Sequence, residues 1–142
     1  MKKIIITILA LVMGIFMYSQ TNLTSDNSEF SRAYLNVLLS YYDEDGEKQY
    51  KEFEGSNVFT FNVDGNSIVL YKHSGNVNRY IYLDNAINGK DDVGDTYQLI
   101  KTIDVESSET VYFQLYDNKD FGLKLIYEES VFFIHFYNKI TE

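Results

Sequence analysis

The chain has 142 residues with a formal net charge of −9, and it contains neither cysteine nor proline. Its lysines and arginines are scattered singly among carboxylates, which argues against nucleic acid and anionic lipid as partners, because both need clustered positive side chains. Without cysteine there can be no disulfide and no lipoprotein type of signal. The core must therefore come from packing alone, to which 13 Tyr and 10 Phe contribute.

The N-terminus has the pattern of a secretory signal peptide. Lys2 and Lys3 precede an apolar run over residues 4–18, and Ser19 offers a small residue for cleavage before Gln20. The run is shorter than the roughly 20 residues that cross a bilayer, so we expect cleavage of residues 1–19 rather than a retained membrane anchor. Losing both lysines would take the formal charge from −9 to −11. We therefore expect an exported protein, periplasmic or extracellular, with no stable membrane anchor.

The mature chain is expected to hold one domain. Residues 20–29 are polar and aperiodic, so we interpret them as a flexible N-terminus before a single β domain over 30–142. The segment 30–42 fits both a helical stripe and a strand face. The turn signal at 43–47, with extended-looking sequence at 48–53 after it, favours a strand.

From Val58 onward, runs rich in Val, Ile, Phe, Tyr and Thr alternate with turn residues at the spacing of a meander. Asp64-Gly65-Asn66 favours a tight hairpin. The stretch 85–95, which includes Gly89 and Gly94, is expected to be the longest loop of the β region. The predicted strands cover residues 58–63, 67–72, 78–84, 96–104, 110–117, 122–128 and 131–138.

These runs predict an all-β fold, an antiparallel meander of about seven to nine strands that forms a curved sheet, an open barrel or a sandwich. The run 131–137 is apolar on both faces, so it should be central or covered on both sides. The predicted core comprises Phe59, Phe61, Val63, Ile81, Leu83, Leu99, Val111, Phe113, Leu115, Leu123, Leu125, Phe132, Ile134 and Phe136.

Few residue patterns support catalysis or metal binding. His73 is expected to be exposed at a loop edge and His135 to be a satisfied core or face histidine, and their spacing matches no metal motif. The acidic turns at 43–47 and 117–120 do not match the calcium-loop pattern. Asp120-Phe121-Gly122 matches a kinase magnesium motif without any other kinase feature. We therefore predict no enzymatic activity, no cofactor and no metal; a paired-carboxylate hydrolase stays open only because no pattern selects its pair.

Tyrosines provide the candidate binding residues. Tyr80 and Tyr82 share one face of their strand, and Tyr112 and Tyr116 share one face of theirs. Such a face is a binding patch if it is open to solvent and part of the core if it is covered, and the covered state is the commoner one. We expect a noncatalytic binding or interaction module that uses a tyrosine-rich sheet face or the loop 85–95, with a protein or a small apolar ligand as partner.

Two aromatic strand sequences support a resemblance to known proteins. Asn78-Arg-Tyr-Ile-Tyr-Leu83 and Val131-Phe-Phe-Ile-His-Phe-Tyr137 follow a short signal that ends at Ser19-Gln20. In this arrangement the chain resembles the small exported, uncharacterised all-β proteins of Bacteroidota. The resemblance spans most of the chain without a diagnostic motif, and it implies export and a β fold but no activity.

An alternative function follows from the number of strands. Eight or so meandering strands on a chain of this size can close around one ligand, as in lipocalin and fatty-acid-binding barrels. The G-x-W motif of lipocalins is absent, since the chain has no tryptophan. The alternative is therefore a lipocalin-like carrier of a small apolar molecule, with inward-facing Phe and Tyr around a cavity.

Overall fold

The computed structural model describes residues 28–130 and 132–139, and it is all-β over these residues. The expected signal over 1–19 and most of the expected flexible segment lie outside the described residues. None of the described residues belongs to a helix long and apolar enough to cross a membrane. The described strands are β1 (Phe30–Tyr42), β2 (Lys48–Val63), β3 (Ser67–Tyr71), β4 (Val77–Tyr82), β5 (Ile87–Lys90), β6 (Thr96–Asp104), β7 (Thr110–Tyr116), β8 (Leu123–Tyr127) and β9 (Phe132–Tyr137).

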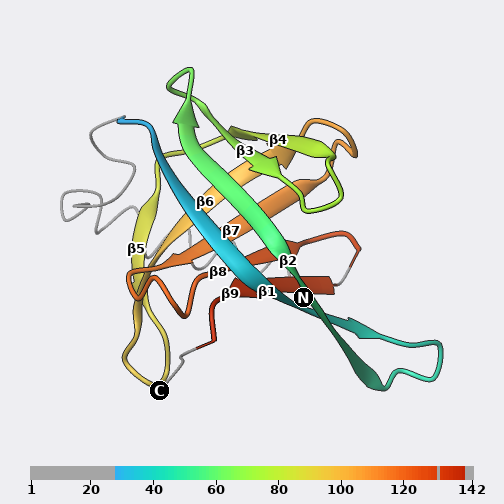
Figure 1. The fold of residues 1–142 in the computed structure, drawn as a ribbon. Helices are drawn as coiled ribbons and strands as arrows, with labels where there is room; N and C mark the ends of the chain where they lie inside the picture. The colour runs from blue at the N-terminus through green and yellow to red at the C-terminus, as the bar shows by residue number, and fades with distance from the viewer. Residues whose placement is uncertain (1–27, 131, 140–142) are drawn as a thin grey trace.

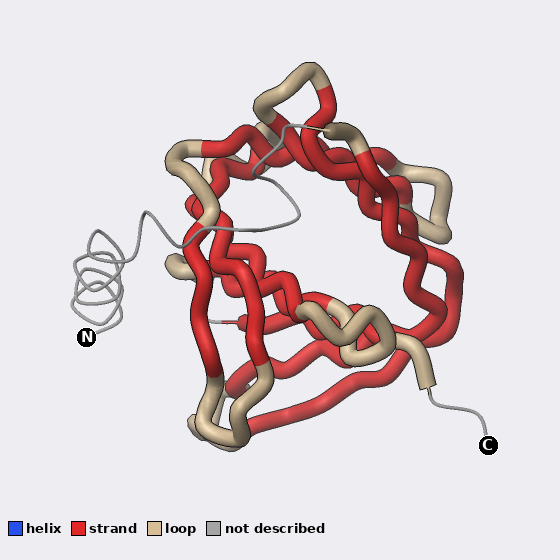
Figure 2. The backbone as a smooth tube through the Cα atoms, turned by 90° about the vertical axis from the view of Figure 1, so that its left-hand side faces the viewer, coloured by secondary structure: helices blue, strands red, loops and turns tan. Residues whose placement is uncertain are grey.

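The strands form an antiparallel meander that closes into a barrel (Figures 1 and 2). Consecutive strands pair with one another from β1 to β4 and from β5 to β9. Two further pairings close the ring, because β9 pairs with β1 and β4 pairs with β6. The predicted all-β meander is confirmed, and closure selects the barrel among the three architectures that the sequence leaves open.

The segment 30–42 is confirmed as a strand, and β2 joins the predicted extended runs 48–53 and 58–63 into one strand. The loop prediction for residues 85–95 is wrong in part, because β5 lies inside it. This strand exists through its pairing with β6, in which Gly89 faces Tyr97. A Cβ on Gly89 would lie 2.5 Å from the Tyr97 ring, so the glycine makes room for the aromatic side chain.

The core fills the middle of the barrel. Alternate residues of each strand point inward, and the rings of Phe59, Phe61 and Phe113 pack edge to face there. The predicted face of β4 is wrong: Tyr80 and Tyr82 point inward, while Ile81 points outward and Leu83, just after the strand, is exposed. The core cluster comprises Tyr34, Phe59, Phe61, Ile68, Leu70, Tyr80, Ala86, Ile100, Val111, Phe113, Leu115, Leu123, Leu125, Tyr127 and Phe136.

The same correction applies to β6, where Ile100 is buried and the predicted core residue Leu99 lies on the outer face, half-buried. The pairing register of β6 in the closed barrel decides which face of the strand points inward. Gln98 and Thr102 share this inner face with Ile100. The prediction that residues 131–137 form a central strand is confirmed for β9, which has β1 on one edge and β8 on the other.

Candidate functional site

A cavity of about 390 Å³ opens at the end of the barrel that holds the β3–β4 turn. The pairing register of β1, β9 and β8 brings three apolar side chains together in its wall. Ile134 on β9 lies opposite Leu39 on β1 and opposite Leu125 on β8. These three side chains face the lumen at one level, and the wall therefore spans three adjacent strands. The remaining lining residues are Val37, Phe53, Glu54, Gly55, Asn57, Leu70, Lys72, His73, Ser74, Tyr80, Tyr127 and Phe136.

Two tyrosines and a carboxylate form a buried polar cluster at this cavity. The hydroxyls of Tyr80 and Tyr127 lie 3.3 Å apart, and that of Tyr127 donates to Asp104 Oδ2 over 3.4 Å. Burial is the main cause that raises the pKa of both tyrosines, so they stay protonated at neutral pH. Asp104 also accepts the backbone N–H groups of Glu106 and Ser107, which anchors the carboxylate. The cavity thus combines an apolar wall with a small set of fixed hydrogen-bonding groups.

The rim of the cavity is held by contacts between β2 and the β3–β4 turn. Asn57 Oδ1 accepts the backbone N–H of His73 over 3.1 Å, and the His73 ring packs so closely on Gly55 that a Cβ there would lie 2.7 Å from its Cγ. His73 is exposed, as the sequence predicted, but it lines the cavity mouth as well. Lys72 and Ser74 complete the polar side of this rim.

The four tyrosines singled out in the sequence lie on two sides of the barrel wall. Tyr80 lines the cavity, and Tyr82 points inward further along β4, where its hydroxyl donates to Asn62 Oδ1 over 2.9 Å. Tyr112 and Tyr116 lie on the outer face of β7 with only 5% and 2% of their surface exposed. The two pairs therefore do not form one continuous face.

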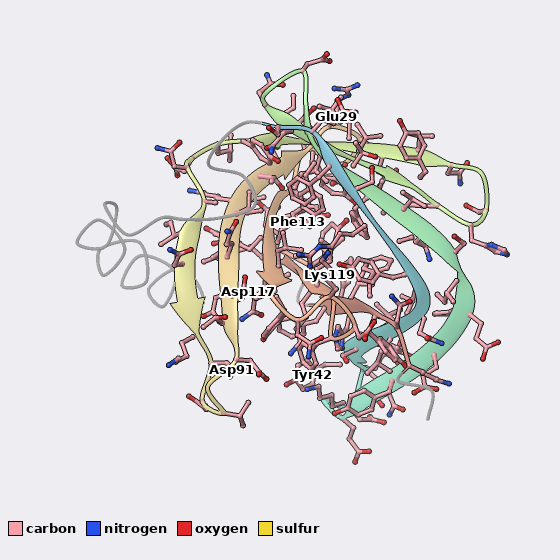
Figure 3. The ribbon with its side chains drawn as sticks, turned by 60° about the vertical axis from the view of Figure 1, so that its left-hand side comes forward. Glu29, Tyr42, Asp91, Phe113, Asp117 and Lys119 are labelled. Atoms are coloured by element: carbon pink, nitrogen blue, oxygen red, sulfur yellow. The ribbon has the colours of Figure 1, made fainter. Side chains whose placement is uncertain are left out.

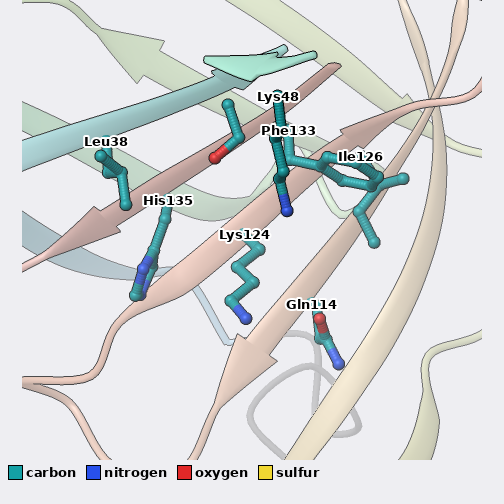
Figure 4. Close-up of a pocket in the computed structure, with 8 residues that line it drawn as sticks. Leu38, Lys48, Gln114, Lys124, Ile126, Phe133 and His135 are labelled. Carbon is teal, nitrogen blue, oxygen red and sulfur yellow. The ribbon is translucent and has the colours of Figure 1, made fainter. Parts of the chain in front are cut away.

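An outer groove of about 330 Å³ crosses β1, β9, β8 and β7 on the outside of the barrel (Figure 4). His135 lines this groove, and its Nε2 lies 2.7 Å from the backbone oxygen of Phe121. This satisfied face position confirms the prediction for His135. Burial lowers the pKa of this histidine, and nearby Lys124 lowers it further, so the ring is neutral at pH 7 and Nε2–H is the donor to the carbonyl. The groove is lined by Leu38, Ser40, Lys48, Gln114, Lys124, Ile126, Phe133 and His135.

Sequence reasoning missed Tyr127, Asp104 and Arg32, all of which are buried. Asp104 ends a predicted strand, where an acidic residue is typical of a turn, and nothing local distinguishes it from other turn residues. Arg32 is buried, and its guanidinium donates to the backbone oxygen of Tyr116 over 2.9 Å. For Tyr127 a signal was available, because it shares one strand face with Leu123 and Leu125.

In the described part of the chain, no three His, Asp or Glu side chains gather closely enough to hold a metal ion. The chain matches no family model, no curated protein and no solved structure.

Proposed function

We propose that this protein is a noncatalytic exported binding module that carries a small, mainly apolar ligand in the cavity between β1, β8 and β9. The observation that carries this proposal is the cavity itself, which is walled by inward-facing Leu39, Leu125 and Ile134 and opens to solvent at one barrel end. A volume of about 390 Å³ lies at the lower end of the usual range for ligand pockets. The ligand is therefore a small molecule rather than a long chain.

The polar cluster narrows the chemistry of the ligand. Tyr80 and Tyr127 present hydroxyls at the inner, largely apolar part of the cavity. Tyr127 donates its proton to Asp104 and Tyr80 donates its own to Tyr127, so both oxygens keep the capacity to accept a hydrogen bond. A ligand with one hydroxyl group at its inner end, which can donate to these oxygens, matches this arrangement. A ligand with several charges does not, because the charged residues Glu54 and Lys72 lie at the rim, the inner wall is apolar, and desolvation of charge there is costly.

The interior is a better candidate than the tyrosine-bearing outer face. Tyr112 and Tyr116 are nearly covered by their neighbours, so they offer little surface to a partner. The cavity instead provides concave apolar surface with a few convergent polar groups, which is the usual form of a small-molecule site. The proposed location of this activity is outside the cytoplasm, which follows from the N-terminal lysines and the apolar run after them.

Titration with the uncharged fluorescent probe N-phenyl-1-naphthylamine tests the proposal. We expect saturable binding of one probe per chain. Ile134→Trp should weaken it about tenfold or more, because the indole fills the space that the probe needs. Val93→Trp is the control, since Val93 is exposed on the β5–β6 turn and does not line the cavity. Native mass spectrometry of the exported protein should in addition show a small co-purifying mass.

Probe binding without saturation would contradict the proposal, and so would equal affinity in the Ile134→Trp and Val93→Trp variants. The melting temperature of each variant should be measured alongside, so that a loss of binding is assigned to a filled cavity only when the barrel is intact.

A further inference from the structure

A second pocket of about 440 Å³ lies at the opposite end of the barrel, between the start of β1 and the β7–β8 loop. It exists because β1 pairs with β9 only from Asn36 to Ser40, so the first residues of β1 extend beyond the end of β9. The side chain of Asn138 bridges part of this edge, accepting from the backbone of Leu35 and donating to that of Ala33. The rest of the gap is the pocket.

Arg32 is the unusual member of this pocket. It is only 8% exposed, and its Nη1 donates to a backbone oxygen rather than to a carboxylate. The ion pair found among residues 28–130 and 132–139 joins Arg79 and Asp64 at the surface and leaves Arg32 without a counter-ion. Since a buried charge is normally paired, a guanidinium in this position has hydrogen-bond donors and charge available for an anion.

Tyr34 provides a second donor at the same place. Its side chain lines the pocket, is almost completely buried, and has a hydroxyl with no hydrogen-bond partner in the part of the chain that the structure describes. Tyr34 and Arg32 are both buried and two residues apart on β1, so they share one face of the strand. Burial raises the pKa of Tyr34, and the approach of the Arg32 guanidinium to its hydroxyl, which falls short of hydrogen-bond geometry, together with the charge of Arg32 partly offsets the rise. A buried hydroxyl without a partner is rare in folded proteins and points to a ligand that the hydroxyl would bind.

The remaining lining fits an anion that carries an apolar part. Lys119, which is labelled in Figure 3, contributes a positive charge from the exposed β7–β8 loop. Phe30 forms an apolar side of the pocket and stacks on Phe61 with ring centroids 4.7 Å apart. A single buried cation balances one negative charge, so a monoanion suits the pocket better than a dianion.

We propose that this pocket binds the carboxylate of a small organic acid, with Arg32 and Tyr34 donating to the carboxylate oxygens and Phe30 contacting the apolar part. Guanidinium and carboxylate have matching geometry, and their charge-assisted hydrogen bonds are among the strongest in proteins. The inference does not rest on the proposed carrier function. The two pockets lie at opposite ends of the lumen, and the packed rings of Tyr34, Phe59 and Phe136 separate them.

Isothermal titration of the full chain with phenylacetate and with phenylacetamide tests this site. The two probes have nearly the same shape and differ in charge, so a site built for a carboxylate should bind the acid at least about tenfold more tightly. Arg32→Met should abolish this preference. Arg79→Met removes the same charge from the surface and should change the affinity for phenylacetate less than about twofold.

Tyr34→Phe keeps the inference testable if Arg32→Met fails to fold, because it removes only a hydroxyl that has no partner in the described residues. It should weaken phenylacetate binding about three- to tenfold and leave the melting temperature of the free protein unchanged or higher. Equal affinity for the two probes would overturn the inference. Retention of the preference in Arg32→Met would do so too, as would unchanged phenylacetate affinity in Tyr34→Phe. Loss of N-phenyl-1-naphthylamine binding in Ile134→Trp has no bearing on this result.

Discussion

Single residues decide how closely the backbone segments of this barrel approach one another. Gly122 precedes β8 with a φ of +88°, and its carbonyl accepts from the N–H of Tyr116 over 3.0 Å. A Cβ at this position would lie 1.9 Å from the backbone oxygen of Phe136 on β9. Only glycine can therefore occupy the site without moving one strand away from the other.

Replacing Gly122 with alanine should lower the free energy of unfolding by at least about 2 kcal/mol, because left-handed strain and a backbone clash act together. Gly75→Ala is a matched control, since Gly75 has a φ of +94° with nothing within 4 Å of the added Cβ. It should lower the free energy of unfolding by about 1 kcal/mol from conformation alone. Urea unfolding of both variants measures the difference, and equal losses would refute the clash.

At the scale of the element, the β1–β2 hairpin is the longest unit of the fold and extends past the strands beside it. The pairing of β1 with β9 ends at Ser40, while that with β2 continues to Tyr42. Beyond Ser40 the hairpin therefore depends on its own turn. Asp43 organises this turn, since its Oδ1 accepts the N–H groups of Asp45 and Glu47 over 2.9 Å each.

The turn of this hairpin should loosen in acid. The hydrogen bond from Glu47 and then that from Gln49 lower the pKa of Asp43 below its ordinary value of 3.8. A carboxylate with a lowered pKa stabilises the folded turn above pH 3.8, and this contribution is lost as the pH falls through the lowered pKa. The amide proton shifts of Asp45 and Glu47 should titrate with a midpoint below 3.8. Asp43→Ala should remove this step, and a midpoint at or above 3.8 would contradict the prediction.

At the scale of the whole molecule, the barrel has a packed middle and two open ends. Phe113 lies at its centre, with ring centroids 6.0 Å from Phe59, 6.4 Å from Phe61 and 4.9 Å from Tyr80 (Figure 3). These aromatic rings join strands from both halves of the chain, and they separate the two end pockets. The same packing thus provides stability and separates the two proposed ligand sites.

Phe113→Ala should lower the free energy of unfolding by about 3–5 kcal/mol, since it removes a fully buried ring and leaves a cavity. Phe53→Ala is the control on the same residue type, because Phe53 is 52% exposed at the cavity rim and should have little effect on stability. Equilibrium unfolding in urea compares them. Similar midpoints for the two variants would show that the aromatic centre does not dominate stability.

Part of the candidate site could be predicted from the sequence. The sequence pattern indicates Tyr80 as a candidate binding residue because it shares one strand face with Tyr82, and Tyr80 does line the cavity, on a face that points into the barrel. Its orientation depends on the pairing of β4 with β6, in which Tyr80 lies opposite Asp104. Hydrophobicity alone favours an inward position for the aliphatic residues of β4. The pairing register of the barrel decides the opposite, so Ile81 lies on the outer face.

The sequence alone determined the features that depend on neighbouring residues. Alternation of apolar and polar residues specified the strands, and Asp64-Gly65, both with positive φ, specified a hairpin turn. The N-terminal pattern likewise predicts export. Only the tertiary structure decided what depends on distant residues, namely the closure of β9 on β1 and of β4 on β6, the existence of β5, and the burial of Arg32. Local patterns set which face a side chain shares with its neighbours, but the lumen exists only after strands about 100 residues apart have paired, and that pairing decides which face becomes the inside.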